Sequence, residues 1–277
     1  MVLLDLMQGE EDYELVVAHV NHGIRIEADE DEALVHDMAA VHGLSFYSLR
    51  LELGEKASEA EARRYRYNFL EEVKKETNAQ AIITAHHLDD RLETMLLNEQ
   101  RGAGWLGMAP LLDTPNVKRP LLKIPKAEIY KYAKERNLSW REDLTNQDPN
   151  YTKRNRLRAE LDESSRVELM QRLEEYDEYR EQRLDEVEEV IAKGVSEDQG
   201  QVLLNRTVLL NGDKRMSRDV IYILLKRYFT NELEIDFDAV VRLEHFYKTA
   251  RTGKQLSLSG DLWARLDDDA MVLYVAR

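Results

Sequence analysis

Three short apolar segments alternate with two helical segments in the first hundred residues of the chain. The apolar segments are residues 15–20, 46–51 and 79–85, and each is bounded by polar residues. The run at 79–85 is short and β-branched, which is typical of a buried strand, and the other two are strand candidates as well. Residues 29–42 and 57–77, which lie between them, carry apolar side chains at helical spacing. This strand–helix alternation predicts an α/β fold with a parallel sheet.

The sequence pattern changes after about residue 160. An acidic segment at 171–190 has apolar side chains along one edge of a long helix. Shorter helical and strand-like segments follow it, at 202–210, 218–229, 237–248, 255–258 and 262–274. The last two predict a C-terminal β-hairpin. We therefore predict a first domain at 1–160 and a second at 161–277, which consists of a linker helix and a smaller, mainly helical domain.

Composition excludes several kinds of protein. The 277 residues include no cysteine, so disulfides and thiolate zinc sites play no part. No apolar stretch reaches the roughly 20 residues of a membrane span, and the opening MVLLDLM lacks the basic flank of a signal peptide, so we expect a cytoplasmic protein without a membrane partner. A net charge of −15 argues against non-specific nucleic-acid binding. Two local basic clusters could still bind a polyanion: Lys118, Arg119, Lys123 and Lys126, and Lys153, Arg154, Arg156 and Arg158.

The segment HHLDDRLET at 86–94 concentrates acidic residues directly after the strand predicted at 79–85. If a helix starts here, Asp89 and Asp90 lie four and three residues before Glu93, so the carboxylates share one face. The carboxyl edge of a parallel sheet is where ligands bind. The acidic group could therefore hold a metal ion, an ammonium group or a proton in transfer.

Structural interpretations compete with functional ones at three places. At the acidic segment, a metal site is disfavoured because His86 and His87 are adjacent and point apart on most backbones, and a helix cap is another alternative. Elsewhere, one helical face could carry only surface ion pairs, and one polar segment is typical of a solvated loop. The residues of the face are Glu59, Arg63, Arg66 and Tyr67, and those of the loop are Asp143, Asn146, Arg154, Asn155 and Arg158.

Taken in order, several segments of the chain resemble bacterial tRNA(Ile)-lysidine synthetases. They are AHVNHGIR at 18–25, EARRYRY at 61–67, TAHHLDDRLET at 84–94, RG at 101–102, RPLL at 119–122, and WREDLTN with RNRLR across 140–158. Each motif is weak alone, and the ordered set is specific. The resemblance is close over residues 1–160 and looser beyond. It implies a Rossmann-like PP-loop enzyme that uses ATP to attach lysine to the wobble cytidine of an isoleucine tRNA with a CAU anticodon.

The resemblance also implies a role for each candidate residue. ATP would adenylate the C2 carbonyl oxygen of the cytidine, and the lysine ε-amine would then displace AMP. Three acids, Asp89, Asp90 and Glu93, would hold and deprotonate lysine or bind the Mg²⁺ that accompanies ATP, with Asp90 as the metal ligand. The residues expected near ATP are His22, Arg63, His86 and Arg119. The residues expected to bind tRNA are Arg154, Asn155 and Arg158, whereas Arg91 is expected to point to solvent.

The resemblance has one large departure. The family opens with a strand and a glycine-rich SGGxDS loop whose backbone amides cradle the pyrophosphate, whereas MVLLDLM resembles the helix after that loop. We therefore expect an N-terminally truncated catalytic domain, without activity as written. A tRNA-binding module that has lost catalysis is the alternative. A metal-dependent hydrolase built on HHLDDRLET is disfavoured, because it would explain none of the other motifs. The second domain is expected to contact tRNA, and a homodimer is one of the oligomeric states that the sequence leaves open.

Overall fold

The computed structural model describes residues 1–9, 13–23, 27–54, 59–142, 148, 152–229 and 237–276. The chain forms two compact units, Met1–Asp177 and Glu178–Arg277. The boundary falls inside the long helix α8 (Glu163–Gly194), which gives its first part to one unit and its second part to the other. The domain boundary predicted near residue 160 lies just before this helix begins.

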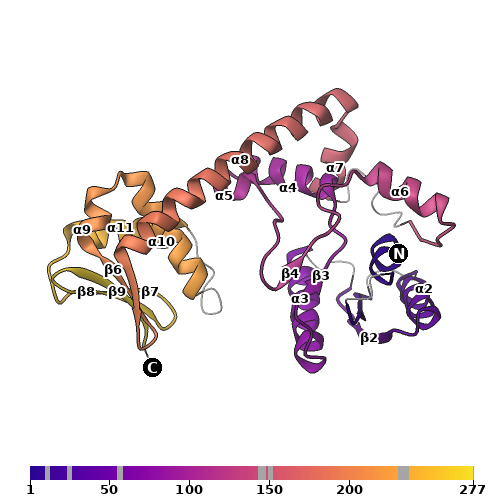
Figure 1. The fold of residues 1–277 in the computed structure, drawn as a ribbon, viewed down its shortest axis with the longest axis horizontal. Coiled ribbons are helices and arrows are strands. Elements are labelled where there is room, and N and C mark those ends of the chain that lie inside the picture. Colours follow the sequence, from indigo (N-terminus) through magenta and orange to yellow (C-terminus); the bar gives the residue numbers. More distant parts are fainter. Residues whose placement is uncertain are drawn as a thin grey trace. The chain divides into compact units, whose positions relative to one another are not determined.

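The first unit alternates strands and helices, as predicted (Figure 1). Its elements before α8 are α1 (Val2–Met7), β1 (Val16–Asn21), α2 (Ala28–Val41), β2 (Ser45–Arg50), α3 (Glu59–Glu76), β3 (Ile82–Ile83), α4 (Leu88–Gln100), α5 (Trp105–Met108), β4 (Val117–Lys118), α6 (Lys126–Glu135) and α7 (Lys153–Glu160). The helices of the described residues are too short or too polar to span a bilayer.

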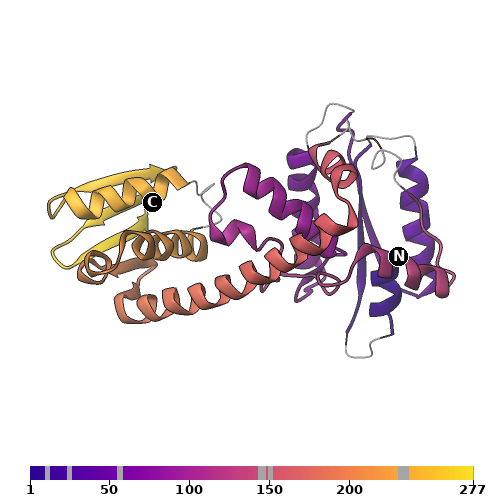
Figure 2. The same cartoon turned by 90° about the horizontal axis from the view of Figure 1, so that it is seen from above.

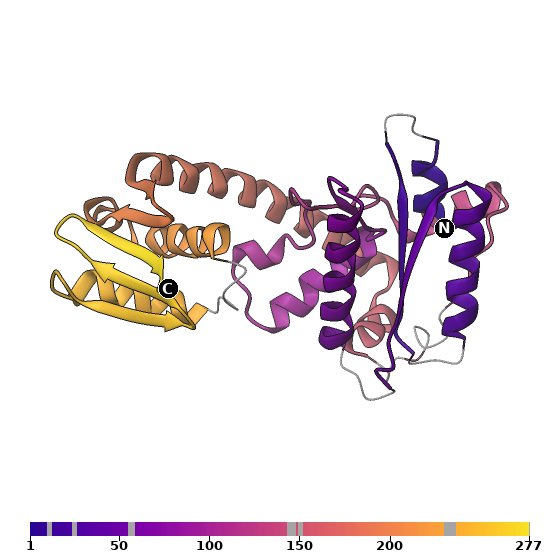
Figure 3. The same cartoon turned by 90° about the horizontal axis from the view of Figure 1, so that it is seen from below.

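The strands of the first unit pair in parallel, which confirms the predicted fold class. β1 pairs with β2, and β3 pairs with β4. Figure 3 shows α2 and α3 on opposite faces of the β1–β2 pair. Within the described residues no strand joins the two pairs. Residues of β1 and β3 instead line the same mainly apolar cavity, of about 490 Å³.

Two predicted segments differ from the structure. The strand predicted at 79–85 is only two residues long, because its partner β4 is equally short. The predicted loop is helical from Lys153 onward, since the Thr152 hydroxyl accepts the Asn155 N–H at 3.0 Å and caps α7. Arginine, leucine, alanine and glutamate, which follow the cap, all favour helix. Asp143 and Asn146, the other residues assigned to that loop, lie outside the described residues.

The core of the first unit forms between α4, α5 and the first part of α8. Its buried side chains are Leu88, Leu92, Met95, Met108, Leu169 and Leu173. The expectation that Arg91 points to solvent is wrong, because this residue is only 2% exposed. Its guanidinium donates to both carboxylate oxygens of Asp177, at 2.9 and 2.6 Å, and to the Pro110 carbonyl at 3.1 Å. A partly buried ion pair therefore joins α4 to α8.

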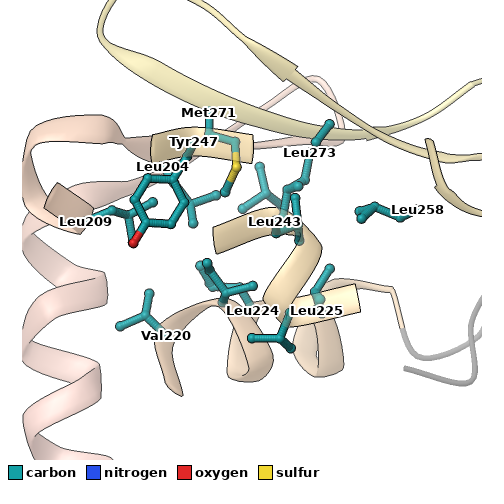
Figure 4. Close-up of a cluster of buried hydrophobic side chains, with 14 of the residues drawn as sticks. Leu204, Leu209, Val220, Leu224, Leu225, Leu243, Tyr247, Leu258, Met271 and Leu273 are labelled. Carbon is teal, nitrogen blue, oxygen red and sulfur yellow. The ribbon is translucent and has the colours of Figure 1, made fainter. Parts of the chain in front are cut away.

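The second unit places three helices against an antiparallel sheet. Its elements after α8 are β5 (Val195–Asp198), β6 (Gln201–Asn205), α9 (Arg206–Asn211), α10 (Lys214–Tyr228), α11 (Phe237–Thr249), β7 (Gln255–Ser259), β8 (Leu262–Leu266) and β9 (Ala270–Val275) (Figure 2). The strand order is β5-β6-β9-β8-β7, so the predicted hairpin is part of a larger sheet. Figure 4 shows the core between sheet and helices, where Leu204 and Leu273 face Leu224 and Leu243.

Candidate functional site

The start of α4 fixes the acidic residues of the HHLDDRLET segment. His87 precedes the helix with extended backbone, and its N–H donates to the Asp90 carboxylate at 3.0 Å. Asp90 therefore caps the helix, as the structural alternative proposed. The same carboxylate lies 3.5 Å from the His87 ring nitrogen and 4.0 Å from the guanidinium of Arg158.

Asp89 and Glu93 project into a small cavity of about 210 Å³ beside α4. We call it the carboxylate pocket; its charged lining residues are Asp89, Glu93, Lys126, Arg158 and Arg166, with two leucines between them. One oxygen of Asp89 accepts the backbone N–H of Lys126 at 2.8 Å, and the other pairs with Arg166. The N-terminus of α6 is thereby anchored to α4.

Glu93 is the most deeply placed acid of the pocket, at 2% exposure. The fork of Arg158 holds both of its oxygens: Nη2 lies 2.9 Å from Oε2, and Nε donates to Oε1. The guanidinium of Arg154 lies 3.8 Å from the same carboxylate. Arg154 and Arg158, which are expected to bind tRNA, thus both lie beside Glu93, which is expected to hold lysine. Arg166 belongs to this group as well and was missed, because no motif surrounds it in the sequence.

Asn155 lies on α7 with Arg154 and Arg158, in a different environment. It is 4% exposed. Its side-chain amide donates to the Asp148 carbonyl at 2.8 Å, and its oxygen accepts the Thr152 hydroxyl at 2.8 Å. These bonds hold the beginning of α7 in place.

Two histidines, His22 and His86, follow the carboxyl ends of β1 and β3, and the charges of Arg63, Arg66 and Arg119 act on His86. We call these five residues the arginine–histidine group. Burial lowers the pKa of His86 to about 4, with Arg119, Arg63 and Arg66 adding to the effect against the opposing charge of Asp90. The imidazole is therefore neutral at pH 7. Its Nδ1 lies 2.8 Å from the Thr84 hydroxyl.

His22 enters this group through a tight turn. Gly23 follows it with φ of +64°, and a Cβ at that position would lie 2.1 Å from the Leu51 carbonyl oxygen, so only glycine fits. Burial lowers the pKa of His22, and the nearby charge of Arg66 lowers it further. Arg66 was not among the residues predicted to bind ATP, although its helical spacing from Arg63 pointed to it.

Part of the group's hydrogen-bonding capacity is unused. Arg119 is 8% exposed, and its Nη1 donates to the Leu112 carbonyl at 2.7 Å. Its Nε and the Nδ1 of His22 are buried and have no hydrogen-bond partner among the described residues. Buried polar groups are normally satisfied. Arg63 lies with its guanidinium 4.6 Å from the centre of the Tyr67 ring. The arrangement fits an anion, since it supplies positive charge and spare donors.

Within the described residues, no group of three histidine, aspartate or glutamate side chains is arranged to hold a metal ion. Mg²⁺ is commonly bound through one or two carboxylates together with substrate phosphates, so a single carboxylate such as that of Asp90 matches its usual protein contribution.

Comparison with known proteins places these features in a family. The PP-loop domain model matches residues 1–164. The tRNA(Ile)-lysidine synthase of Exiguobacterium sibiricum is 38% identical over 165 residues, which cover 58% of this chain and 39% of that protein. That of Thermus thermophilus is 42% identical over 155 residues, or 53% of this chain and 30% of that protein. The bifunctional protein TilS/HprT of Listeria monocytogenes is 30% identical over 234 residues, 78% of this chain and 36% of that protein.

A solved structure shares the fold. The U34-tRNA thiolase NcsA from Methanococcus maripaludis aligns with a TM-score of 0.52 at 17% identity, over 65% of this chain and 67% of that chain. The chain spans between 30% and 39% of the length of the curated relatives named above. With the family model matching more than half of its residues, the chain belongs to the PP-loop domain family and is similar, within it, to tRNA(Ile)-lysidine synthases.

Proposed function

We propose that this chain carries the active site of an enzyme that ligates lysine to the wobble cytidine of isoleucine tRNA with a CAU anticodon. ATP is consumed, and AMP and pyrophosphate are released. One observation carries the proposal: a pocket with two buried carboxylates adjoins a group of arginines and histidines, so a site for an amine lies beside a site for phosphates. The relationship to tRNA(Ile)-lysidine synthases supports it.

The carboxylate pocket is suited to the side chain of lysine. Asp89 and Glu93 supply the carboxylates for an ammonium group, which would replace a cationic partner that each has in the free protein. Leu92 and Leu161 offer apolar contact to the methylene chain of lysine. A buried carboxylate can also accept the proton that the amine must lose before it attacks. The positive side chains of Lys126 and Arg166, which line the same pocket, would bind the α-carboxylate of lysine.

The arginine–histidine group is suited to the phosphates of ATP. In the proposed reaction the cytidine O2 attacks the α-phosphorus and pyrophosphate leaves. The lysine nitrogen then bonds to C2, the C2–O bond breaks, AMP departs and the amine proton passes to a carboxylate. The unused donors of His22 and Arg119 would bind phosphate oxygens, and Mg²⁺ would accompany ATP with Asp90 as its protein ligand. Both ATP and tRNA are present in the cytoplasm, where we propose that the reaction takes place.

Substitutions on α4 test the role of the pocket. The test uses an extended chain, meaning these 277 residues preceded by the strand and SGGxDS loop of a family member. Glu93→Gln should reduce lysine incorporation into isoleucine tRNA by about a hundredfold or more, because the variant loses the charge that positions the amine and takes its proton. Glu99→Gln, the same change at a more exposed site on the same helix, should retain activity. Equal incorporation by the two variants would refute the assignment.

A further inference from the structure

In the free protein, both acids of the carboxylate pocket already have cationic or N–H partners. Both oxygens of Glu93 are held by the fork of Arg158. One oxygen of Asp89 pairs with Arg166, and the other accepts the Lys126 N–H at 2.8 Å. All four carboxylate oxygens that face the pocket therefore have a cationic or N–H partner. An incoming ammonium group would find no free acceptor among them.

Arg158, the partner of Glu93, is exposed enough to exchange this carboxylate for another anion. Arg158 retains 31% exposure of its side chain, whereas that of Glu93 is 3% exposed. The helix that carries Arg158 is strongly basic, with Lys153, Arg154 and Arg156 in the same two turns and no acid in its first turn. Such a helix suits an RNA backbone, and arginine binds phosphate with the same fork that it uses for a carboxylate.

We propose that Arg158 couples RNA binding to lysine binding, an inference that rests on the proposed function. In the free protein Arg158 occupies the position of the lysine ammonium group on Glu93. When α7 contacts the tRNA backbone, Arg158 exchanges Glu93 for a phosphate, and the bared carboxylate then accepts lysine. The enzyme would therefore bind lysine after tRNA, and its affinity for lysine would be low when no tRNA is bound.

Thermodynamic linkage between the two ligands allows the coupling to be measured from equilibrium affinities. If tRNA raises the affinity for lysine by some factor, lysine must raise the affinity for tRNA by the same factor. Removing the Arg158 guanidinium should abolish the coupling, because it takes away the hydrogen bonds that occupy both oxygens of Glu93. Arg154, 3.8 Å from the same carboxylate, is present in every form compared. A variant that keeps α7 basic elsewhere should preserve it.

The experiment measures lysine binding by calorimetry to the 277-residue chain, with and without isoleucine tRNA. The variant is Arg158→Gln, and the matched control is Arg156→Gln, an exposed arginine on the same helix. Arg158→Gln should bind lysine alone at least about tenfold more tightly than the unaltered chain. Addition of tRNA should tighten lysine binding to the unaltered chain and to Arg156→Gln, and leave Arg158→Gln unchanged. Norleucine, which keeps the α-amine and lacks the ε-amine of lysine, should bind to none of these forms.

Each outcome decides the matter. If the unaltered chain binds lysine as tightly as Arg158→Gln, the coupling is refuted while the lysine pocket stands. If no form binds lysine with or without tRNA, the proposed function fails together with the coupling. Should Arg158→Gln melt at a lower temperature than the control, Arg158→Lys replaces it. That variant retains the charge but not the fork, and is expected to shift lysine affinity in the same direction by a smaller factor.

Discussion

His86 is partly buried in its neutral form, and this makes the first unit sensitive to acid. Its folded pKa is about 4, whereas an unfolded histidine titrates near 6.5. Between these values the unfolded chain binds more protons than the folded one, so stability is complete above pH 6.5 and falls as the pH drops toward 4. The pKa values of His22 and His87 are lowered as well, chiefly by burial, and act in the same direction.

Urea unfolding at pH 7 and pH 5 tests this dependence. The unaltered chain should lose about 1 kcal/mol more stability between the two pH values than His86→Asn does, after allowance for the partial exposure of the ring. His245→Asn, at an exposed position in the second unit, should behave like the unaltered chain. Parallel pH profiles for His86→Asn and the unaltered chain would show that His86 titrates normally.

The ion pair of Arg91 with Asp177 should contribute to the stability of the first unit. Arg91→Met would strand the carboxylate of Asp177, which is 28% exposed, and should cost about 2–3 kcal/mol. Adding Asp177→Asn should recover part of this loss, because the remaining amide carries no buried charge. Denaturant unfolding of both forms measures the effect. A double variant less stable than the single one would contradict the view that the unpaired charge is the cause.

The helices and strands that the sequence predicts correctly are those whose own residues determine them. The amphipathic spacing of α2, α3 and α4 and the β-branched run of β1 are visible without knowledge of the rest of the chain. The acidic triad was found for the same reason, since its members lie within a single helical turn or so. Contacts between residues far apart in the sequence are visible only in the structure. Arg158 reaches Glu93 across 65 residues, Arg166 reaches Asp89, and the β3–β4 pairing decides how short β3 is.

Strand and turn boundaries in the second unit were less predictable. The segment 262–274 forms two strands because Asp267–Asp269, which are poor strand formers, mark a turn between them. The polar strand β5, with only a partly buried valine, carries no hydrophobic pattern and was missed. α7 was predicted as a loop because the asparagines, aspartates and proline before it outweighed its helix-forming residues.

The unjoined strand pairs of the first unit yield an element-scale prediction. The extended chain should melt several degrees higher than the 277-residue chain, because the added strand can pair with β1 or β3 and fill the apolar cavity that both of them line. Adding the strand without the SGGxDS loop should give most of this gain. Thermal melts that coincide for all three forms would show that the added strand does not enter the sheet.

At the scale of the whole molecule, local charge and overall charge differ in sign. The net charge of −15 makes non-specific RNA binding unfavourable, while the basic residues of α7 and the arginine–histidine group form local positive regions. Binding of tRNA should therefore depend on its fit to these regions more than on bulk attraction. The two units have separate hydrophobic clusters, so each has a core of its own.

The most direct test of the account is mass spectrometry of nucleosides from isoleucine tRNA with a CAU anticodon, after incubation with ATP, lysine and the extended chain. Lysidine should form at the wobble position when all three components are present, and should be absent when ATP or lysine is omitted. An unmodified wobble cytidine after incubation with a folded extended chain that binds both ATP and tRNA would contradict the proposed function.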